Sequence, residues 1–382
     1  MGRGLTAEII EVGELSASER DRWLAWIAAD PALASPYFHP DFAVVAAEVA
    51  PGARLAVLHR DGQVAGFFPH QWRGGAVQPL GAPLNDYHGV VTAPGERIAL
   101  EQLAGLMGAR SLSVTGWTGP AAEADTLTAS RTLQADLRAG WDAYMADRRA
   151  RFGKFFKDKE RVRRGLERDL GPVTVEIDSR DPAHLERLIN LKQDQYRRSL
   201  RHDIFDCGWT ADLLRALVAA EGPLRARLAV LSAGAEPLAY ELGLAAGGHY
   251  HFWFPAYEAR AARYSPGMLL SMDTMQAASA EGFGIFDFGF EGEAYKKYFC
   301  DLSQQVLEGV SLRPGLVRAV ASAARPDAGL ALSVRRRWAT IDACETTTIG
   351  RVKAVGAAAS AMLSRSRPPN AAGAVMLAAL CL

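Results

Sequence analysis

The sequence has few cysteines, and they follow no recognisable site pattern. Four cysteines occur in 382 residues without CxxC or CxH spacing: Cys207, Cys300, Cys344 and Cys381. This spacing argues against a zinc site and against a disulfide framework. Free thiols suit a reducing compartment. We therefore expect no metal and no structural disulfide.

Long apolar runs and an excess of either charge are also missing. No segment reaches the ~20 apolar residues of a spanning helix, and the start, MGRGLTAEIIEVGEL, lacks the apolar core and cleavage site of a signal peptide. Basic and acidic residues number 43 each, so no global charge favours nucleic acid. We expect a cytoplasmic protein without a nucleic-acid partner; peripheral membrane contact through the apolar residues 371–382 stays an alternative.

The composition that remains, 49% hydrophobic and 23% charged, is that of a globular protein long enough for two domains. The spacing of the apolar residues predicts two series of helices and strands that follow the same order along the chain. The first series has a strand at 8–12, helices at 18–29 and 42–49, a hairpin at 54–59 and 63–72 around Asp61-Gly62, a helix at 100–107 and a strand at 111–115. The clearer second series has a strand from Val173, helices at 182–199 and 209–220, and strands at 227–231, 238–244 and 249–254.

The segment from Tyr264 to Phe299 carries the strongest functional signal. Ser265 and Pro266 predict a helix start, Gly282 predicts its end, and a short apolar strand at 285–288 follows. Asp287 interrupts that strand, directly before a polar loop. A carboxylate inside an otherwise buried strand is the kind of inconsistency that functional sites produce.

A basic segment lies between the two series. Residues 148–168 contain ten lysines or arginines against three acidic residues. One interpretation is a solvated linker helix. The other is a site for an anionic ligand such as a nucleotide-sugar pyrophosphate or a lipid diphosphate, with Arg161 and Arg164 as candidates because arginine forks match phosphate oxygens.

The order of elements and several short motifs resemble a known group. The motifs are Asp86-Tyr87, Ala239-Tyr240, Tyr264-Ser265-Pro266-Gly267, and Asp287-Phe288-Gly289 followed by Glu293, Tyr295 and Lys296. The second half resembles GNAT acyltransferases. Residues 10–312 or so resemble their tandem, FemAB-like branch, particularly CelD-type proteins linked to bacterial exopolysaccharide and cellulose production, and holdfast-polysaccharide acyltransferases are similar.

The resemblance implies an α+β fold of tandem GNAT-like domains, each a mixed, mostly antiparallel sheet flanked by helices. The expected divisions are an N-terminal domain at 1–147, a basic linker helix at 148–170, the acyltransferase domain at 171–312 and an Ala/Arg-rich tail at 313–382. It also implies an acyl donor, acetyl-CoA, whose phosphates meet the helix start at Ser265, Gly267 and Met268. The segment RAARYSPG departs from the usual Q/R-x-x-G-x-G/A signature, so coenzyme A is implied by the superfamily alone.

The same resemblance assigns catalytic roles. We expect Asp287 to act as general base, with burial raising its pKa toward working pH. Tyr295 or Tyr298 would be the acid, and Lys296 would hold a phosphate or the oxyanion. His249 and His251 are alternative catalytic groups. The acceptor would bind between the halves, and its candidate contacts are Asp86, Tyr87, Tyr240, Arg161 and Arg164.

The tail offers a second basic cluster, Arg335, Arg336, Arg337 and Trp338. It predicts either a docked helix or a regulatory site for cyclic di-GMP. For the whole chain we expect an N-acyltransferase that modifies an amino sugar of a surface polysaccharide, or its nucleotide- or lipid-linked precursor. The alternatives are a FemAB-like aminoacyltransferase on a peptidoglycan precursor and a non-catalytic nucleotide-sensing or scaffold protein.

Overall fold

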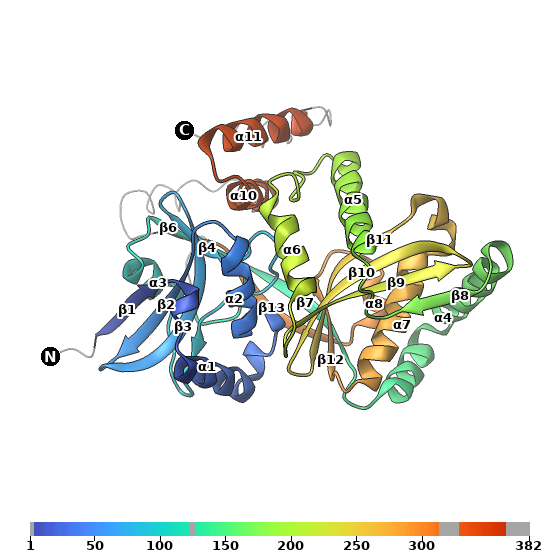
Figure 1. Cartoon of the computed structure of the whole chain (residues 1–382), viewed down its shortest axis with the longest axis horizontal. Helices are drawn as coiled ribbons and strands as arrows, with labels where there is room; N and C mark the ends of the chain where they lie inside the picture. The colour runs from blue at the N-terminus through green and yellow to red at the C-terminus, as the bar shows by residue number, and fades with distance from the viewer. Residues whose placement is uncertain (1–3, 122–126, 313–327, 364–382) are drawn as a thin grey trace.

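A computed structural model describes residues 4–121, 127–312 and 328–363. Two lobes lie side by side, and two C-terminal helices lie above their junction (Figure 1). Among the described residues, thirteen strands join in one sheet that runs through both lobes. This mixed sheet, mostly antiparallel and flanked by helices, is the predicted α+β architecture.

The first lobe follows the predicted order. Its hairpin turns tightly because Asp61 and Gly62 adopt φ of 53° and 78°. The lobe contains strands β1 (Leu5–Ile10), β2 (Ala53–Arg60), β3 (Gln63–Arg73), β4 (Ala76–Pro79), β5 (Val91–Thr92), β6 (Ser111–Trp117) and β7 (Leu127–Asp136), helices α1 (Ala17–Ala29), α2 (Pro40–Val49) and α3 (Leu100–Leu106), and the short turns η1 (Val12–Glu14), η2 (Pro31–Leu33) and η3 (Pro36–Phe38).

The second lobe repeats the series. It contains helices α4 (Trp141–Leu170), α5 (Pro182–Ser199), α6 (Trp209–Ala219), α7 (Pro266–Ala280) and α8 (Lys296–Phe299), the turn η4 (Ala259–Tyr264), and strands β8 (Val173–Glu176), β9 (Arg225–Ala233), β10 (Glu236–Ala246), β11 (His249–Tyr257), β12 (Ile285–Phe290) and β13 (Leu302–Leu312). Helices α10 (Ala328–Cys344) and α11 (Thr348–Leu363) follow. The predicted helix start is confirmed, because Ser265 is at the N-cap of α7 and Pro266 begins the helix, but Ser265 adopts φ +49° and its side chain makes no capping bond.

The two lobes share strands. The sheet order is β1-β2-β3-β4-β6-β13-β7-β12-β11-β10-β9-β8, with β5 on β3. Strand β13 therefore lies between two strands of the first lobe, and β7 pairs with β12 of the second. The expected division at residue 147 falls inside α4.

Two parallel pairs mark equivalent places in the lobes. In the second lobe, β11 and β12 pair from His249↔Ile285 to His251↔Asp287 and go no further. In the first, β4 and β6 pair only at Ala76↔Ser111 and Val77↔Leu112. Each pair thus separates toward its carboxyl end.

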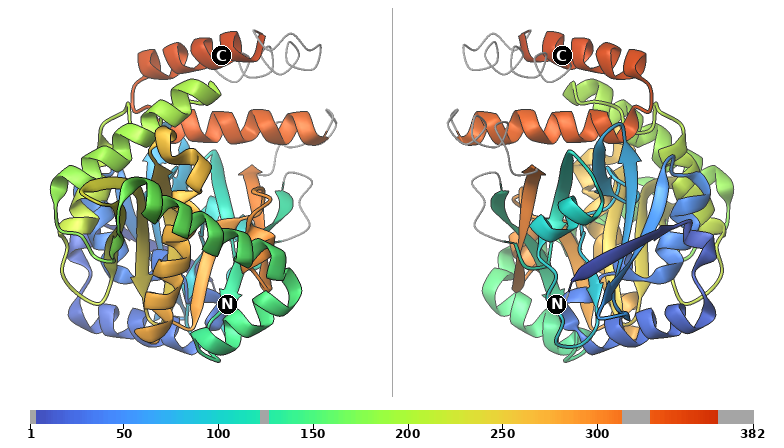
Figure 2. Two further views of the ribbon diagram at one scale, coloured as in Figure 1. Left: turned by 90° about the vertical axis from the view of Figure 1, so that its right-hand side faces the viewer. Right: turned by 90° about the vertical axis from the view of Figure 1, so that its left-hand side faces the viewer.

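Helices cover both faces of the second lobe. Helices α5 and α6 pack on one face in a core shared with α2. Helices α7 and α4 cover the other, where Phe286 and Phe288 of β12 lie. Because successive side chains of a strand point to opposite faces, Asp287 faces away from α7. Figure 2 shows α10 and α11 stacked at one end of the sheet.

Candidate active site

The loop that carries Asp86 and Tyr87 is held against strand β6. The backbone N–H of His88 donates to Gly116 O (3.0 Å), and the N–H of Thr118 donates to His88 O (3.0 Å). Gly116 has φ +63°, and a Cβ there would lie 1.8 Å from the carbonyl oxygen of Asp86. Glycine is therefore required for this close approach.

The Asp287-Phe288-Gly289 motif forms a matching turn at the end of β12. The backbone N–H of Gly289 donates to Asp287 Oδ1 (2.7 Å). Gly289 has φ +65°, and a Cβ would lie 2.5 Å from Oδ2 of Asp86. The glycine thus makes room for a carboxylate from the other lobe.

Asp287 is the centre of a buried hydrogen-bond cluster. The Tyr87 hydroxyl donates to its Oδ2 (2.6 Å), Gln134 Nε2 of β7 donates to the same atom (3.1 Å), and His249 Nε2 lies 3.1 Å from it. Although burial raises the pKa of this carboxyl, the histidine bonds and charges outweigh it and hold the pKa well below its usual range. The expected rise in the pKa of Asp287 is therefore wrong: Asp287 is a stable carboxylate with four neighbours on its oxygens.

His251 connects this cluster to Asp86. Its Nε2 lies 3.1 Å from Oδ2 of Asp86, and its Nδ1 lies 3.8 Å from Oδ1 of Asp287. Burial lowers the pKa of His251, but the two carboxylates together raise it to about 9. The ring is fully buried, and the edge-on ring of Tyr37 lies 5.1 Å away. At neutral pH His251 is an imidazolium between two carboxylates.

The sequence carried a signal for this histidine. In HYHFWF, strand alternation places His249, His251 and Trp253 on one face. Trp253 Nε1 donates to Leu84 O (2.6 Å), which ties that face to the loop before Asp86. The histidines that sequence reasoning ranked as alternatives therefore lie in the cluster itself.

Asp86 opens into a cleft of about 320 Å³ between the lobes and α10. Its side chain is 33% exposed, whereas that of Asp287 is 0% exposed. Asn85 also lines the cleft; its Nδ2 donates to Tyr87 O (3.2 Å), and its buried Oδ1 has no hydrogen-bond partner among the described residues. The other polar lining includes Glu291, Glu308 and Arg336. Acceptors thus outnumber donors on these walls.

The start of α7, the expected donor-phosphate site, lies on the opposite face. Lys159 of α4 donates to the Oγ of Ser265 (3.2 Å), so a cation stands beside the helix start. The Met268 N–H, however, already donates to Ser265 O (3.0 Å). At Gly267 a Cβ would meet only Tyr257, at 3.6 Å, so the protein leaves free space above this residue.

The basic helix does not line the cleft. Helix α4 is joined to α7 by Arg163, whose Nη1 donates to both oxygens of Asp273 (2.9 and 2.8 Å). Arg161 is exposed and bonds to Asp158 (2.6 Å), and Arg164 is exposed. The expectation that one acceptor site includes Asp86, Tyr87 and these arginines is wrong, because the two groups lie on opposite faces of the sheet.

The remaining expected residues have local packing roles. The ammonium of Lys296 donates to Phe288 O (2.7 Å) and Phe290 O and pairs with Glu293 (2.8 Å). These three partners leave it no donor for a phosphate or an oxyanion. Tyr240 is buried on the α5 face, 5.9 Å from the ring of His184.

The tyrosines proposed as the acid lie in the aromatic core beside α4. The ring of Tyr295 contacts Phe288 and Phe299, and burial raises its pKa above the usual range. Tyr298 stacks on Phe155 with ring centroids 3.9 Å apart.

Sequence reasoning did not single out Lys192, a half-buried lysine of α5 beside β11. Its ammonium is 3.5 Å from Pro255 O and lies over the rings of Tyr196 and Phe254. Burial lowers its pKa to about 8. A lone lysine inside an amphipathic helix gave no signal in the sequence.

In the predicted regulatory cluster, Arg335 to Trp338, one arginine is already paired with a carboxylate of the protein. Arg336 donates to both oxygens of Glu308 (2.8 and 2.6 Å), so its guanidinium is already paired with a carboxylate. Trp338 packs against α11. Arg335 and Arg337 lie on the same helix, but the side chain of Arg335 is outside the described residues.

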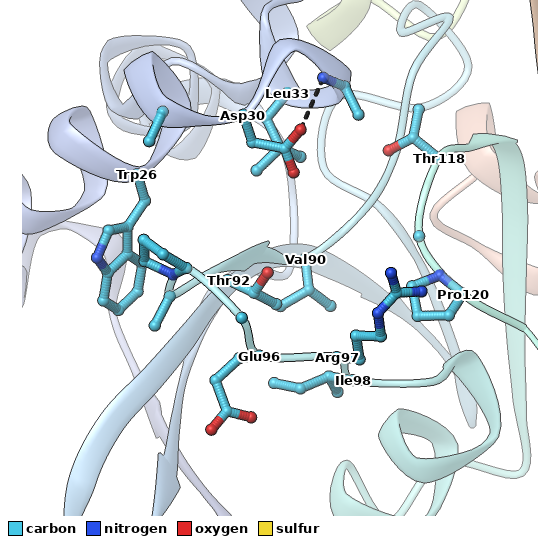
Figure 3. A pocket seen from close by; sticks show the side chains of 16 residues that line it. Trp26, Asp30, Leu33, Val90, Thr92, Glu96, Arg97, Ile98, Thr118 and Pro120 are labelled. Carbon is cyan, nitrogen blue, oxygen red and sulfur yellow. Dashed lines mark hydrogen bonds between the residues drawn. The ribbon is translucent and has the colours of Figure 1, made fainter.

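Outside the cluster, the described residues form a second cavity but no metal site. Within residues 4–121, 127–312 and 328–363, no cluster of three or more His, Cys, Asp or Glu residues could hold a metal ion, and no helix is long and apolar enough to cross a membrane. A separate cavity of about 600 Å³ lies in the first lobe, between α1 and the loops around Thr92 and Thr118 (Figure 3). The cluster around Asp287 contributes nothing to its lining.

Comparisons with known proteins find similar backbones and one matching family model. No curated protein matches the chain. Solved structures with similar backbones include the C-terminal domain of a putative lysylphosphatidylglycerol synthetase from Agrobacterium fabrum (13% identity, 80% of this chain and 95% of that chain covered, TM-score 0.47). They also include a tandem GNAT protein from the clavulanic acid biosynthesis pathway (10% identity, 82% of this chain and 99% of that chain covered, TM-score 0.47). A third is FemX (13% identity, 79% of this chain and 96% of that chain covered, TM-score 0.47). Residues 153–297, which carry His249, His251 and Asp287, match the family model of the acetyltransferase (GNAT) domain.

Proposed function

We propose that this chain is an N-acyltransferase of the GNAT type whose acceptor amine binds in the cleft beside Asp86. The family match to residues 153–297 supports the acyltransferase class. Our finer proposal is that the acceptor is an amino sugar of a surface polysaccharide or of its activated precursor, and that acetyl-CoA is the donor.

The observation that carries the proposal is the hydrogen-bonded chain of side chains Asp86–His251–Asp287, in which Asp86 lines the cleft. Asp287 is fixed by its four neighbours and keeps His251 protonated. The imidazolium in turn holds one oxygen of Asp86 at 3.1 Å, so the carboxylate keeps a fixed orientation. A positioned carboxylate at a cleft can take the proton that an acceptor amine loses as it is acylated.

The polar lining favours an amine as acceptor. Glu308 is paired with Arg336, and Glu291 is paired with Arg131. Asp86, 33% exposed, is therefore the carboxylate that a ligand in the cleft can reach. An ammonium group supplies donors and a positive charge, and it would bind to the free oxygen of Asp86.

The donor would lie where β11 and β12 separate. Ser265, Gly267 and Lys159 fit the phosphate end of coenzyme A, because the space above Gly267 is free and Lys159 supplies a cation. When bound, an acyl-CoA supplies an activated acyl carbon. The residues of this chain would hold it and keep it close to the carboxyl end of β12.

The test measures acetyl transfer from acetyl-CoA to a panel of amino sugars. The readout is the appearance of the free thiol of coenzyme A. We expect thiol release that depends on an amine, and a loss of 10²-fold or more for Asp86→Asn, as is typical of a lost general base. Glu291→Gln is the matched control, because Glu291 lines the same cleft but bonds to Arg131 instead of His251. Transfer from charged tRNA alone would favour the aminoacyltransferase alternative, and no transfer from either donor would contradict the enzyme assignment.

A further inference from the structure

Two cysteine thiols from distant parts of the chain meet at one carbonyl oxygen. The Sγ of Cys207, in the loop before α6, lies 3.3 Å from the carbonyl oxygen of Ile204. The Sγ of Cys344, the last residue of α10, lies 3.9 Å from the same oxygen. Each thiol also shifts the pKa of the other, as expected for two groups that share one acceptor.

The backbone around Cys344 is anchored to both lobes. Trp209 Nε1 of α6 donates to Cys344 O (3.2 Å). From the first lobe, Arg73 Nε donates to Ala343 O (3.1 Å) and Gln78 Nε2 donates to Asp342 Oδ2 (2.5 Å). These bonds fix the end of α10 and thus keep the Cys344 thiol beside the loop that carries Cys207.

The two thiols differ in reactivity. Cys207 is half-buried, and the neighbouring thiol of Cys344 lowers its pKa although burial opposes this. Cys344 is buried, and the thiol of Cys207 together with burial raises its pKa. Because the thiolate is the nucleophile, Cys207 reacts first with an incoming disulfide and Cys344 is the resolving thiol.

We propose that Cys207 and Cys344 form a reversible disulfide that fastens α10 to the second lobe. With glutathione disulfide as oxidant, the Cys207 thiolate attacks one sulfur and releases one glutathione thiolate. Cys344 then attacks the Cys207 sulfur of the mixed disulfide, and the second glutathione leaves with the Cys344 proton. Two protein thiols and one glutathione disulfide thus give one protein disulfide and two glutathione molecules.

The disulfide would affect the cleft through α10. Arg336, Ala339, Thr340 and Ala343 of this helix line the cleft next to Asp86. A covalent link at Cys344 fixes that wall. The modification site itself does not depend on the proposed function, because it can be detected without any assay of transfer.

The experiment treats reduced full-length protein with glutathione disulfide and maps its peptides by mass spectrometry without reduction. We expect a linked Cys207–Cys344 peptide pair and a fall from four free thiols to two. Cys344→Ser should stop at a glutathione adduct on Cys207, and Cys207→Ser should give no linked pair. Cys300→Ser is the matched control, because burial raises the pKa of Cys300 to about 12, and it should oxidise like the unaltered protein.

Three outcomes would overturn the proposal. These are persistent glutathione on Cys207 in the unaltered protein, a link from either cysteine to Cys300 or Cys381, and four unreacted thiols. Thermal unfolding of each serine variant in the reduced state shows whether the fold is intact.

Discussion

The hydroxyl of Tyr87 donates a 2.6 Å hydrogen bond to Asp287, joining two motifs that lie 200 positions apart in the chain. Tyr87 is buried, and its loop is fixed to β6, so the bond transmits the position of the first lobe to the strand that carries the histidine cluster. His251 and Asp86 form a second hydrogen bond between the lobes. The carboxylates of Asp287 and Asp86 thus each accept a hydrogen bond from the opposite lobe.

Replacing Tyr87 tests that connection. Tyr87→Phe leaves Asp287 without its shortest side-chain donor, so we expect a loss of about 2 kcal/mol in the free energy of unfolding, as for other hydrogen bonds to charged groups. Urea unfolding measures it. Tyr37→Phe is the control, because its hydroxyl donates to a neutral carbonyl oxygen, Leu84 O, at 3.3 Å, and should cost about 1 kcal/mol. Equal losses would contradict a special role for the Tyr87 bond.

Gly289 should tolerate no side chain. Gly289→Ala adds a Cβ at 2.5 Å from Asp86 Oδ2 in a residue at φ +65°, so it should displace the carboxylate and reduce transfer by at least tenfold. Gly282→Ala is matched in backbone strain, with φ +88°, but its Cβ meets nothing within 4 Å. The control should lose about 1 kcal/mol of stability and keep its activity. Similar activities in the two variants would argue against the contact.

His251 predicts a pH dependence of stability. Its folded pKa of about 9 lies above the unfolded 6.5, so its contribution is complete below pH 6.5 and is lost as the pH rises through 9. The shift corresponds to about 3 kcal/mol. Denaturant midpoints between pH 6 and pH 9.5 should therefore fall more steeply in the unaltered protein than in His251→Gln. Parallel profiles would show that His251 is neutral in the folded protein.

Glu241 predicts a second pH effect at another place. This buried carboxyl of β10 accepts a bond from Ser271 (3.0 Å), and burial raises its pKa to about 8. Folding then favours the protonated form, so stability falls as the pH rises from the unfolded pKa of about 4.3 to about 8. Glu241→Gln should flatten this slope, whereas Glu291→Gln, at an exposed position, should not. An unchanged slope in Glu241→Gln would contradict the raised pKa.

The sequence was informative where the motifs are local. The sequence alone indicates Asp287-Phe288-Gly289 and Asp86-Tyr87 as candidates, because it shows a carboxylate in an apolar strand and a polar loop at a strand end. It does not indicate that the two motifs are in contact. The direction of the Asp287 pKa was predicted wrongly, because the sequence indicates burial but not the four partners that outweigh it.

The strand β7 shows a different limit. Its residues, LTASRTLQAD, are mostly small or polar, so no apolar alternation marks a strand. The structure explains the composition, because β7 lies between β12 and β13 and supplies Gln134 to the carboxylate of Asp287. Long-range pairing decided this element, and local propensity did not.

The shared strands also limit how the chain can change by recombination. A crossover near residue 147 would bring a β7 from one parent against a β12 and a β13 from another. The same event would bring Asp86 and Tyr87 of one parent against His251 and Asp287 of the other. A hybrid joined at this place would therefore have to rebuild both the shared sheet and the buried cluster.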